Sequence, residues 1–337
     1  MSSPNLAVVG ATGVVGRELL QILAERDFSH GELRAYASSR SRGRSIDYRG
    51  QDLAVQELSP QAFAGIDLAF FCAGSDLSRE YVPQAVAAGA LVIDNSSAFR
   101  LRADVPLVVP ECNGSSIADH AGILANPNCS TIIMVMALAP LHAAFGLRRV
   151  HVVTYQAASG AGQAALTELR SATAALLAGE PHVSSALPHS LALNLFPHID
   201  AFADDGYTLE EDKMLYETRK ILGLEHLTVE ATCVRVPVER CHSMALSLEL
   251  DRACQPDQAR EILTAAPGIK VLDRPDAELY PQPAVWAGQD QVAVGRIRSS
   301  RSFPGGLCLW VVGDQLRKGA ALNAVQIAES VPGRPVL

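Results

Sequence analysis

The chain has 337 residues, of which 48% are apolar and 19% are charged, the composition of a globular protein large enough for two domains. Its formal net charge of −8 argues against nucleic acid or an anionic membrane as a bulk partner, because both favour basic surfaces. Apolar runs are too short to span a membrane, and the seven cysteines contain no CxxC pair. We therefore expect a cytoplasmic protein without a membrane segment, a disulfide framework or a metal site.

A buried strand and a glycine-rich turn open the chain. The apolar run Leu6–Val9 is typical of a strand buried on both faces of a parallel sheet. Glycines follow at three-residue spacing, at Gly10, Gly13 and Gly16, and then comes the apolar stripe of an amphipathic helix, at Val15, Leu19, Ile22 and Leu23. This order places amide groups at a helix N-terminus, where they bind phosphate well. A plain strand-to-helix turn is the alternative, because the spacing departs by one residue from G-x-G-x-x-G.

The second strand bears on the choice of dinucleotide. NAD sites usually carry an acidic residue at the end of this strand, where it binds the ribose hydroxyls. Here the predicted strand Leu33–Ala37 runs into a segment rich in serine and arginine, with no acid before Asp47. Hydroxyl and guanidinium groups suit a 2′-phosphate, so the sequence favours NADP. A solvated basic loop is the alternative.

Strands and helices continue to alternate. Further strands are predicted at Leu68–Cys72 and Leu91–Asp94, with a helix from about 78 to 88 between them. This alternation indicates a doubly wound parallel sheet of the Rossmann type.

Cys129 has the sequence setting of a nucleophile. Asn126-Pro127-Asn128 precedes it and the apolar run Ile132–Leu138 follows, so Cys129 is predicted in the first turn of a helix. Amide groups at such a position lower the pKa of a thiol and also receive an oxyanion. Cys72 and Cys308, by contrast, lie in strand-like runs and are interpreted as small core residues.

His242 lies where two segments of alternating polarity meet. Thr228–Val236 and His242–Leu250 are both predicted to be half-buried strands. An imidazole is the side chain best suited to act as a general base at neutral pH. A structural histidine at the start of a strand is the alternative.

The chain resembles the aspartate-semialdehyde dehydrogenase family nearly from end to end. The segments that carry the resemblance follow the family's order: Gly10–Gly16, Asp94–Arg100, Val105–Glu111, Asn126–Thr131, Thr154–Gly162, Glu210–Met214, Cys233–Val238 with His242, and Gly313–Gln315 with Gly319–Ala321. The resemblance implies a reversible reaction in which aspartate-4-semialdehyde, NADP and phosphate give aspartyl-4-phosphate and NADPH through a cysteine thioester. It also implies a place in the biosynthesis of lysine and diaminopimelate, methionine, threonine and isoleucine.

The resemblance implies a role for each matched residue. The catalytic positions are Cys129 as nucleophile, Gln156 to orient the acyl-enzyme and His242 as acid/base. The substrate-binding positions are Arg235 and Glu210 for the carboxylate and amino groups, and Arg100 and Lys213 for phosphate. The cofactor-binding positions are Gly10, Thr12, Gly13, Val14 and Val15 at the pyrophosphate turn, Arg40 and Ser41 for the 2′-phosphate, and Ser159, Gly160 and Gln315. From residue type alone, a surface charge is the alternative for Arg100, and a position on the solvated face of a predicted helix, Leu209–Leu222, is the alternative for Lys213.

One segment departs from the family pattern. The family commonly has an aromatic-containing stretch that ends in glycine directly before the acid/base histidine, whereas this chain has Glu239-Arg240-Cys241. If the glycine serves a turn with positive φ, Cys241 strains that turn by roughly 1–2 kcal/mol.

The order of the elements predicts an α/β protein of two domains. An NADP-binding domain covers residues 1–127 and is completed by a C-terminal helix at 314–330, and an α+β catalytic and dimerisation domain covers 128–312. Strands at Arg148–Gln156, Thr228–Val236, His242–Leu250, Val292–Arg298 and Leu307–Val312 predict a large mixed sheet in the second domain. The resemblance implies a homodimer or a dimer of dimers that uses one face of this sheet.

Two other functions remain open from the sequence. N-acetyl-glutamyl-phosphate reductases share the fold and the thioester chemistry, but their nucleophile typically lies in a Gly-Cys-Tyr/Phe-Pro setting, whereas Cys129 lies in Asn-Cys-Ser-Thr. A non-catalytic NADP-binding paralogue is the second alternative, motivated by the altered segment Glu239–Cys241. A helix-terminal thiol argues against it, since a protein released from catalysis has no need of one.

Overall fold

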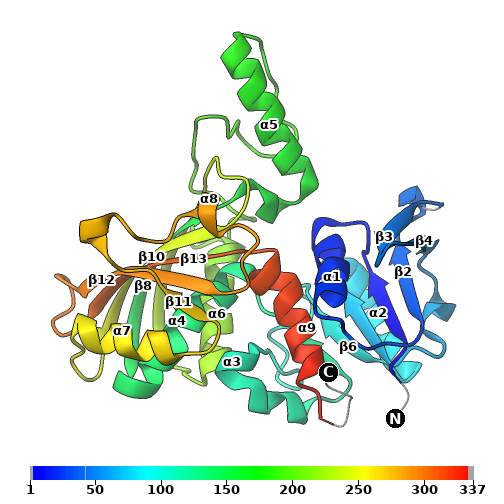
Figure 1. Ribbon diagram of the computed structural model, residues 1–337, viewed down its shortest axis with the longest axis horizontal. Helices are drawn as coiled ribbons and strands as arrows, with labels where there is room; N and C mark the ends of the chain where they lie inside the picture. Colours follow the sequence, from blue (N-terminus) through cyan, green and yellow to red (C-terminus); the bar gives the residue numbers. More distant parts are fainter. Residues whose placement is uncertain (1–2, 42, 333–337) are drawn as a thin grey trace. The chain divides into compact units, whose positions relative to one another are not determined.

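The computed structural model describes residues 3–41 and 43–332. The chain forms two compact units: the first holds the described residues up to Asn128 together with those from Ala320 onward, and the second holds Cys129–Gly319. Each unit has its own sheet (Figure 1). The predicted fold class is confirmed, with a Rossmann-type parallel sheet in the first unit and a mixed sheet in the second.

The first unit is built on a seven-stranded sheet of the order β3-β4-β2-β1-β5-β6-β7. Neighbouring strands are parallel, apart from the antiparallel β3–β4 pair. The strands are β1 (Leu6–Val9), β2 (Leu33–Ala37), β3 (Ser45–Tyr48), β4 (Gln51–Glu57), β5 (Leu68–Phe71), β6 (Leu91–Asp94) and β7 (Ile123–Ala125). The helices are α1 (Val14–Glu25), α2 (Ser75–Ala87), α3 (Pro110–Asn113) and α9 (Leu322–Glu329), with short 3-10 turns at Ser39–Ser41, Pro60–Phe63 and Gly114–Asp119.

The central strands of this sheet are the apolar runs of the sequence. β1, β5 and β6 are buried along their whole length, as strands covered on both faces must be. The helix predicted at 78–88 begins three residues earlier, at Ser75. Gly74 is its N-cap, and the carboxylate of Asp76 stabilises the positive end of its first turn.

The C-terminal segment differs from the single helix predicted from 314. The chain instead forms a π-helical turn at Arg317–Ala321, and α9 begins only at Leu322. The carboxylate of Asp314 accepts the backbone N–H groups of Leu316 at 3.0 Å and Arg317 at 3.2 Å, which holds this stretch in a turn. α9 packs against α1, and its apolar residues belong to the core of the first unit.

The second unit is built on a six-stranded mixed sheet of the order β11-β12-β13-β10-β8-β9. The strands are β8 (Leu147–Gln156), β9 (Thr228–Arg235), β10 (His242–Leu250), β11 (Ile269–Val271), β12 (Val292–Ser299) and β13 (Leu307–Gly313). The helices are α4 (Cys129–Phe145), α5 (Gln163–Ala178), α6 (Leu209–Leu222), α7 (Pro256–Ala265) and α8 (Pro283–Trp286), with 3-10 turns at Ala158–Ala161 and Pro275–Ala277. The predicted strands agree with the observed ones to within one residue.

α4 is the central helix of this unit. Nearly all of its first ten residues are buried, and it packs against four strands of the sheet and against α6 and α7. A helix that is apolar all round belongs inside a core, so the run after Cys129 explains its position. Within the described residues, no helix is long and apolar enough to span a membrane. That same part of the chain contains no group of three or more His, Cys, Asp and Glu side chains able to hold a metal ion.

Candidate active site

The glycine turn of the first unit leaves no room for side chains. Gly10 has a φ of +82°, and a Cβ built on it would lie 2.4 Å from the carbonyl oxygen of Cys72. A Cβ on Gly16 would lie 2.3 Å from the carbonyl oxygen of Gly10. The third glycine, Gly13, is the N-cap of α1, whose first amide groups have no partner within the helix. This cradle fits the pyrophosphate of a dinucleotide.

The cradle lies beside the loop that follows β2. The hydroxyl oxygens of Thr12 and Ser41 are 3.3 Å apart, so the structure brings two of the predicted cofactor residues together. Val14 and Val15 begin α1 at the same turn. The side chain of Arg40 lies outside the described part of the chain.

Arg100 is a buried residue and not a surface charge. Its Nε donates to the carbonyl oxygen of Asn126 at 2.9 Å, and its Nη2 donates to that of Asn95 at 2.7 Å. Burial raises the pKa of the nearby Asp94, whose carboxylate accepts hydrogen bonds from Ser78 and Ser96. The guanidinium of Arg100 is therefore held by backbone carbonyl groups directly after β6 and β7.

Cys129 is the first residue of α4, as predicted. Gly319 lies against it, because a Cβ built on Gly319 would be 3.2 Å from the Cβ of Cys129. Burial raises the pKa of Cys233, Cys241 and Cys72, which makes those thiols poor nucleophiles. Cys129 is only partly buried and is the first residue of a 17-residue helix, so it combines partial exposure with helix-terminal amides.

The register of the mixed sheet brings three predicted residues to one edge. β8 and β9 are parallel and end at the paired residues Gln156 and Arg235. β10 is antiparallel to β8 and begins at His242, which pairs with Gly313 at the end of β13. Gln156 and His242 lie 86 positions apart in the sequence. Backbone pairing alone brings them to the same edge of the sheet.

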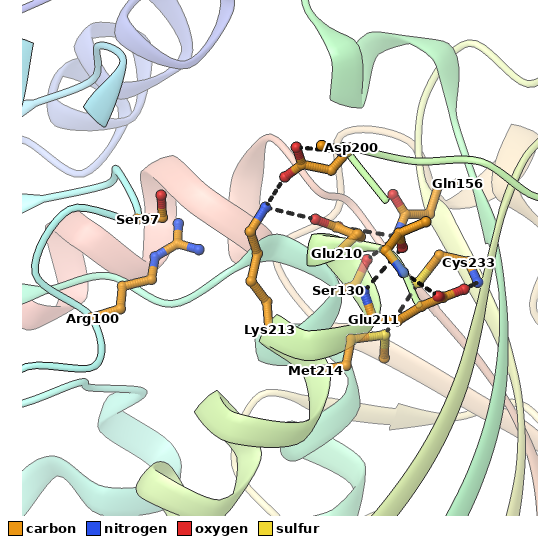
Figure 2. Close-up of polar contacts among 12 residues, drawn as sticks. Ser97, Arg100, Ser130, Gln156, Asp200, Glu210, Glu211, Lys213, Met214 and Cys233 are labelled. Atoms are coloured by element: carbon orange, nitrogen blue, oxygen red, sulfur yellow. Dashed lines mark hydrogen bonds and ion pairs between the residues drawn. The ribbon is translucent and has the colours of Figure 1, made fainter. Parts of the chain in front are cut away.

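Gln156 connects this edge to the nucleophile's helix. Its Nε2 donates to the hydroxyl oxygen of Ser130 at 2.6 Å and to Oε1 of Glu210 at 3.2 Å (Figure 2). Ser130 follows Cys129 directly. All three hydrogen-bonded side chains are buried, so the amide of Gln156 is fixed.

His242 and Arg235 share the backbone of Ala157. Nδ1 of His242 accepts the N–H of Ala157 at 3.1 Å, and Nη1 of Arg235 donates to its carbonyl oxygen at 2.7 Å. Nε2 of His242 is buried and has no hydrogen-bond partner among the described residues. Burial lowers the pKa of His242 well below its usual value, and the charge of Arg235 lowers it further. The ring is therefore neutral at pH 7, with its proton on Nε2.

Gly160 covers both of these side chains. A Cβ built on it would lie 2.9 Å from Cε1 of His242 and 3.1 Å from Nη1 of Arg235. Gly160 is therefore required by its close approach to the two functional groups rather than by its backbone conformation.

Glu210 and Lys213 lie in the first turns of α6, in the second unit. The helix begins at a capping box, in which Thr208 N–H donates to Glu211 Oε2 at 2.7 Å and Glu211 N–H donates to Thr208 Oγ1 at 3.4 Å. Glu210 is buried, and the ammonium of Lys213 donates to its Oε2 at 3.2 Å and to Oδ2 of Asp200 at 2.6 Å. This part of α6 is not a solvated face. Asp200 was missed by the sequence analysis, because no motif or periodicity marks its loop.

The segment that precedes His242 contains the predicted strain. Cys241 has a φ of +75°, in the left-handed region that favours glycine. Its N–H donates to Oε1 of Gln315 at 2.7 Å, and Nε2 of Gln315 donates to the hydroxyl oxygen of Ser159 at 2.6 Å. Ser159 in turn donates through its hydroxyl group to the carbonyl oxygen of Glu239. Two predicted cofactor residues, Ser159 and Gln315, thus bind each other and hold the turn.

Two ion pairs anchor the same segment. Glu239 pairs with Arg170 of α5 at 2.7 Å, at the surface. Arg240 donates through Nε to Oδ2 of the fully buried Asp314 at 2.6 Å. Neither contact follows from the spacing of the residues, so sequence analysis offered no signal for them.

The fold and these side chains define a nicotinamide-dependent dehydrogenase of the semialdehyde type. The model of the semialdehyde dehydrogenase NAD-binding domain matches residues 5–120, and that of the semialdehyde dehydrogenase dimerisation domain matches residues 138–318. An aspartate-semialdehyde dehydrogenase of Aquifex aeolicus is 51% identical over 96% of this chain and 97% of its own, and that of Bacillus subtilis is 47% identical over 97% of each. The chain belongs to the aspartate-semialdehyde dehydrogenase family.

Solved structures agree with this assignment. An aspartate semialdehyde dehydrogenase II of Vibrio cholerae, complexed with ASA, has a TM-score of 0.95 at 43% identity and covers 98% of each chain. The Candida albicans enzyme with NADP has a TM-score of 0.78 at 27% identity and covers 100% of each chain. The protein is thus a phosphorylating dehydrogenase that binds a nicotinamide cofactor and a small-molecule substrate and forms oligomers. Neither alternative raised by the sequence is favoured by these matches.

Proposed function

We propose that the protein catalyses the reversible, NADP- and phosphate-dependent conversion of aspartate-4-semialdehyde to aspartyl-4-phosphate through a thioester on Cys129. The reductive direction serves cytoplasmic biosynthesis of lysine and diaminopimelate, methionine, threonine and isoleucine. The observation that carries the proposal is the hydrogen bond from Gln156 to Ser130, next to Cys129, on the sheet edge that also holds Arg235 and His242.

Cys129 is the proposed nucleophile. As a thiolate it attacks the aldehyde carbonyl to give a tetrahedral thiohemiacetal. Loss of a hydride, for which a bound nicotinamide would be the acceptor, leaves a thioester, and phosphate cleaves this to the acyl phosphate and the free thiolate. Two features support the thiolate: the first amide groups of α4, and the electrostatic interaction of Cys129 with the guanidinium of Arg235. The same amide groups suit the oxyanion that forms when the carbonyl is attacked.

His242 is the proposed acid/base group, acting through Nε2 at the carbonyl oxygen. The neutral ring offers Nε2–H as a hydrogen-bond donor to that oxygen. To accept a proton at Nε2, the ring must carry its own proton on Nδ1 and give up the hydrogen bond from Ala157 N–H. The backbone of Ala157 therefore favours one tautomer of the base.

Charged groups are proposed to hold the substrates. Arg235 suits the substrate's carboxylate, because a planar guanidinium binds carboxylate oxygens in pairs. Glu210, buried and held by Gln156, suits the amino group. Arg100 and Lys213 are proposed to bind phosphate. Gln156 is proposed to orient the acyl group.

The proposed cofactor is NADP, which when bound would supply the hydride acceptor. The turn at Gly10, Thr12, Gly13, Val14 and Val15 suits its pyrophosphate, and the glycine cradle supports this fit. Arg40 and Ser41 are proposed to bind the 2′-phosphate, and Ser159, Gly160 and Gln315 the rest of the cofactor. We accordingly assign cofactor binding to residues 1–127 with 314–330, and catalysis and dimerisation to 128–312.

We propose that the second unit forms a homodimer through one face of its sheet; a dimer of dimers would need a second surface. Val153, Ala245 and Trp310 pair across β8, β10 and β13. All three are partly or fully exposed although they lie in the central strands of the sheet. An apolar row in this position favours burial against a second copy of the chain.

One steady-state experiment tests the proposed function. Oxidation of aspartate-4-semialdehyde is followed by cofactor absorbance, with NADP or NAD and with or without phosphate. We expect phosphate-dependent turnover, at least about 10-fold more efficient with NADP, since a 2′-phosphate adds charge-assisted hydrogen bonds. Cys129→Ala should lose at least about 10⁴-fold in kcat, whereas Cys308→Ala should stay active. Wild-type enzyme without phosphate-dependent turnover would contradict the proposal.

A further inference from the structure

The ammonium of Lys213 lies between two carboxylates. It donates to Oδ2 of Asp200 at 2.6 Å and to Oε2 of Glu210 at 3.2 Å (Figure 2). The side chain of Lys213 is 23% exposed, that of Glu210 is 6% exposed and that of Asp200 is 38% exposed. These three groups sum to one negative charge, which is unfavourable for a site that has to bind an inorganic anion.

The two carboxylates differ in how firmly they are held. Glu210 is buried and also accepts a hydrogen bond from Gln156, which joins it to Ser130 beside Cys129. Asp200 faces solvent on one side, and its remaining hydrogen bond is from the neighbouring Ala201 N–H to Oδ1, at 2.8 Å. Asp200 is therefore the partner that an incoming anion displaces at lower cost.

The backbone keeps Asp200 in place. Its φ is +69°, a left-handed conformation that is uncommon outside glycine and in which aspartate and asparagine are enriched. The hydrogen bond to Ala201 fixes the carboxylate against its own main chain. Burial opposes the charge on Asp200, but the hydrogen bond from Lys213 lowers its pKa, so the carboxylate is ionised at neutral pH.

We propose that Asp200 is a positioning residue that acts as a resident anion, occupying the ammonium of Lys213 until an inorganic oxyanion takes its place. This inference rests on the proposed function, in which Lys213 binds phosphate. Asp200 keeps Lys213 ordered before phosphate arrives and lowers the affinity for phosphate, because phosphate has to displace the carboxylate from the ammonium. In the reductive direction, where phosphate is a product, the carboxylate returns to Lys213 and promotes release.

Asp200→Asn is the decisive variant. Asparagine has nearly the same shape and tolerates positive φ, so the fold is kept. We expect the Kd for inorganic phosphate, measured by calorimetry on the enzyme alone, to fall about 5-fold, because phosphate no longer has to break one partly exposed ion pair. The Kd for sulfate, which binds without reacting, should fall in parallel. The KM for the aldehyde should change by less than about 2-fold, because Glu210 and Arg235 are untouched.

Two controls separate this role from others. Asp204→Asn removes the same charge from an exposed position on the same segment and should leave the phosphate Kd unchanged. In a Lys213→Met background, Asp200→Asn should have no effect on the Kd, because the interaction passes through Lys213.

An unchanged or higher phosphate Kd in Asp200→Asn overturns the inference, as does an effect that persists in Lys213→Met. Because binding is measured without turnover, the inference and the proposed function fail separately. Phosphate binding that responds to Asp200 without phosphate-dependent turnover would refute only the proposed reaction. Turnover with a Kd indifferent to Asp200 would refute only the resident anion.

Discussion

Around Gln156 the functional side chains are held by other side chains, whereas around His242 they are held by the backbone. Gln156, Glu210 and Lys213 form a chain of side-chain hydrogen bonds that ends at the half-exposed Asp200. His242 and Arg235 instead bind the N–H and the carbonyl oxygen of one residue, Ala157. The first region is charged, and the second relies on neutral partners and burial.

The carboxylate region is the part of the site that is able to change during turnover. Ion pairs that reach solvent are weakened by salt and exchanged for bound ions at low cost. Side chains that are hydrogen-bonded to the backbone at the edge of a sheet are displaced only if that backbone is displaced. We therefore expect the carboxylate region to respond to ionic strength and phosphate, and the imidazole region to respond to neither.

Of the variants considered below, His242→Asn should cause the largest loss of activity. Asparagine keeps an acceptor for the N–H of Ala157 but removes Nε2, so kcat should fall by about 10²–10⁴-fold. The loss should be equal at low and high salt, because the ring is buried and neutral. His226→Asn, at an exposed position of the same unit, should be active. A loss that shrinks at high salt would break the proposed distinction.

The neutral imidazole of His242 should be detectable in the pH dependence of the free energy of unfolding. Burial lowers the folded pKa of His242 below its unfolded value near 6.5, so the unfolded state binds more protons as the pH falls. The free energy of unfolding should therefore decrease below about pH 6.5, by up to roughly 1.4 kcal/mol per pH unit, and recover above it. Denaturant titrations between about pH 5 and 7 measure this slope. His242→Asn should reduce the slope, and an identical slope in the variant would contradict a neutral buried ring.

Substitutions of Cys241 in the strained turn should have the smallest effect, and that effect should be on stability. Cys241→Gly and Cys241→Ala remove the same thiol, but only glycine relaxes at a φ of +75°. We expect the glycine variant to be more stable than the alanine variant by about 1 kcal/mol, with similar kcat. The hydrogen bond from residue 241 N–H to Gln315 should hold His242 in both. If the alanine variant were the more stable one, the turn would not be strained.

The sequence predicted those elements whose signals are local. Both ends of α6 agree with the prediction, and the structure shows a local signal at each end: a capping box at Thr208 and a left-handed Gly223. The central parallel strands were recognised because a short continuous apolar run is typical of a strand that is buried on both faces. Cys129 was placed at a helix start by the Pro-Asn-Cys-Ser order and the apolar run behind it.

Tertiary contacts account for what the sequence could not predict. The carboxylate of Asp314 turns the chain after β13 and pairs with Arg240, which lies 74 residues away. The pairing of Asp200 with Lys213 likewise joins a loop to a helix, and neither residue type is unusual where it stands. Such contacts depend on how the helices, strands and loops pack together, and no local pattern in the sequence reports that packing.

Gly160 limits how the enzyme can be redesigned. Its main chain forms a wall against a rigid imidazole on one side and a guanidinium on the other. Even a single added methyl group would press on both, and because Ala157 holds the imidazole and the guanidinium alike, the main chain at residue 160 would have to move. Redesign for longer or bulkier aldehydes therefore has to make room at other positions, because the main chain at Gly160 is already in close contact with both functional groups.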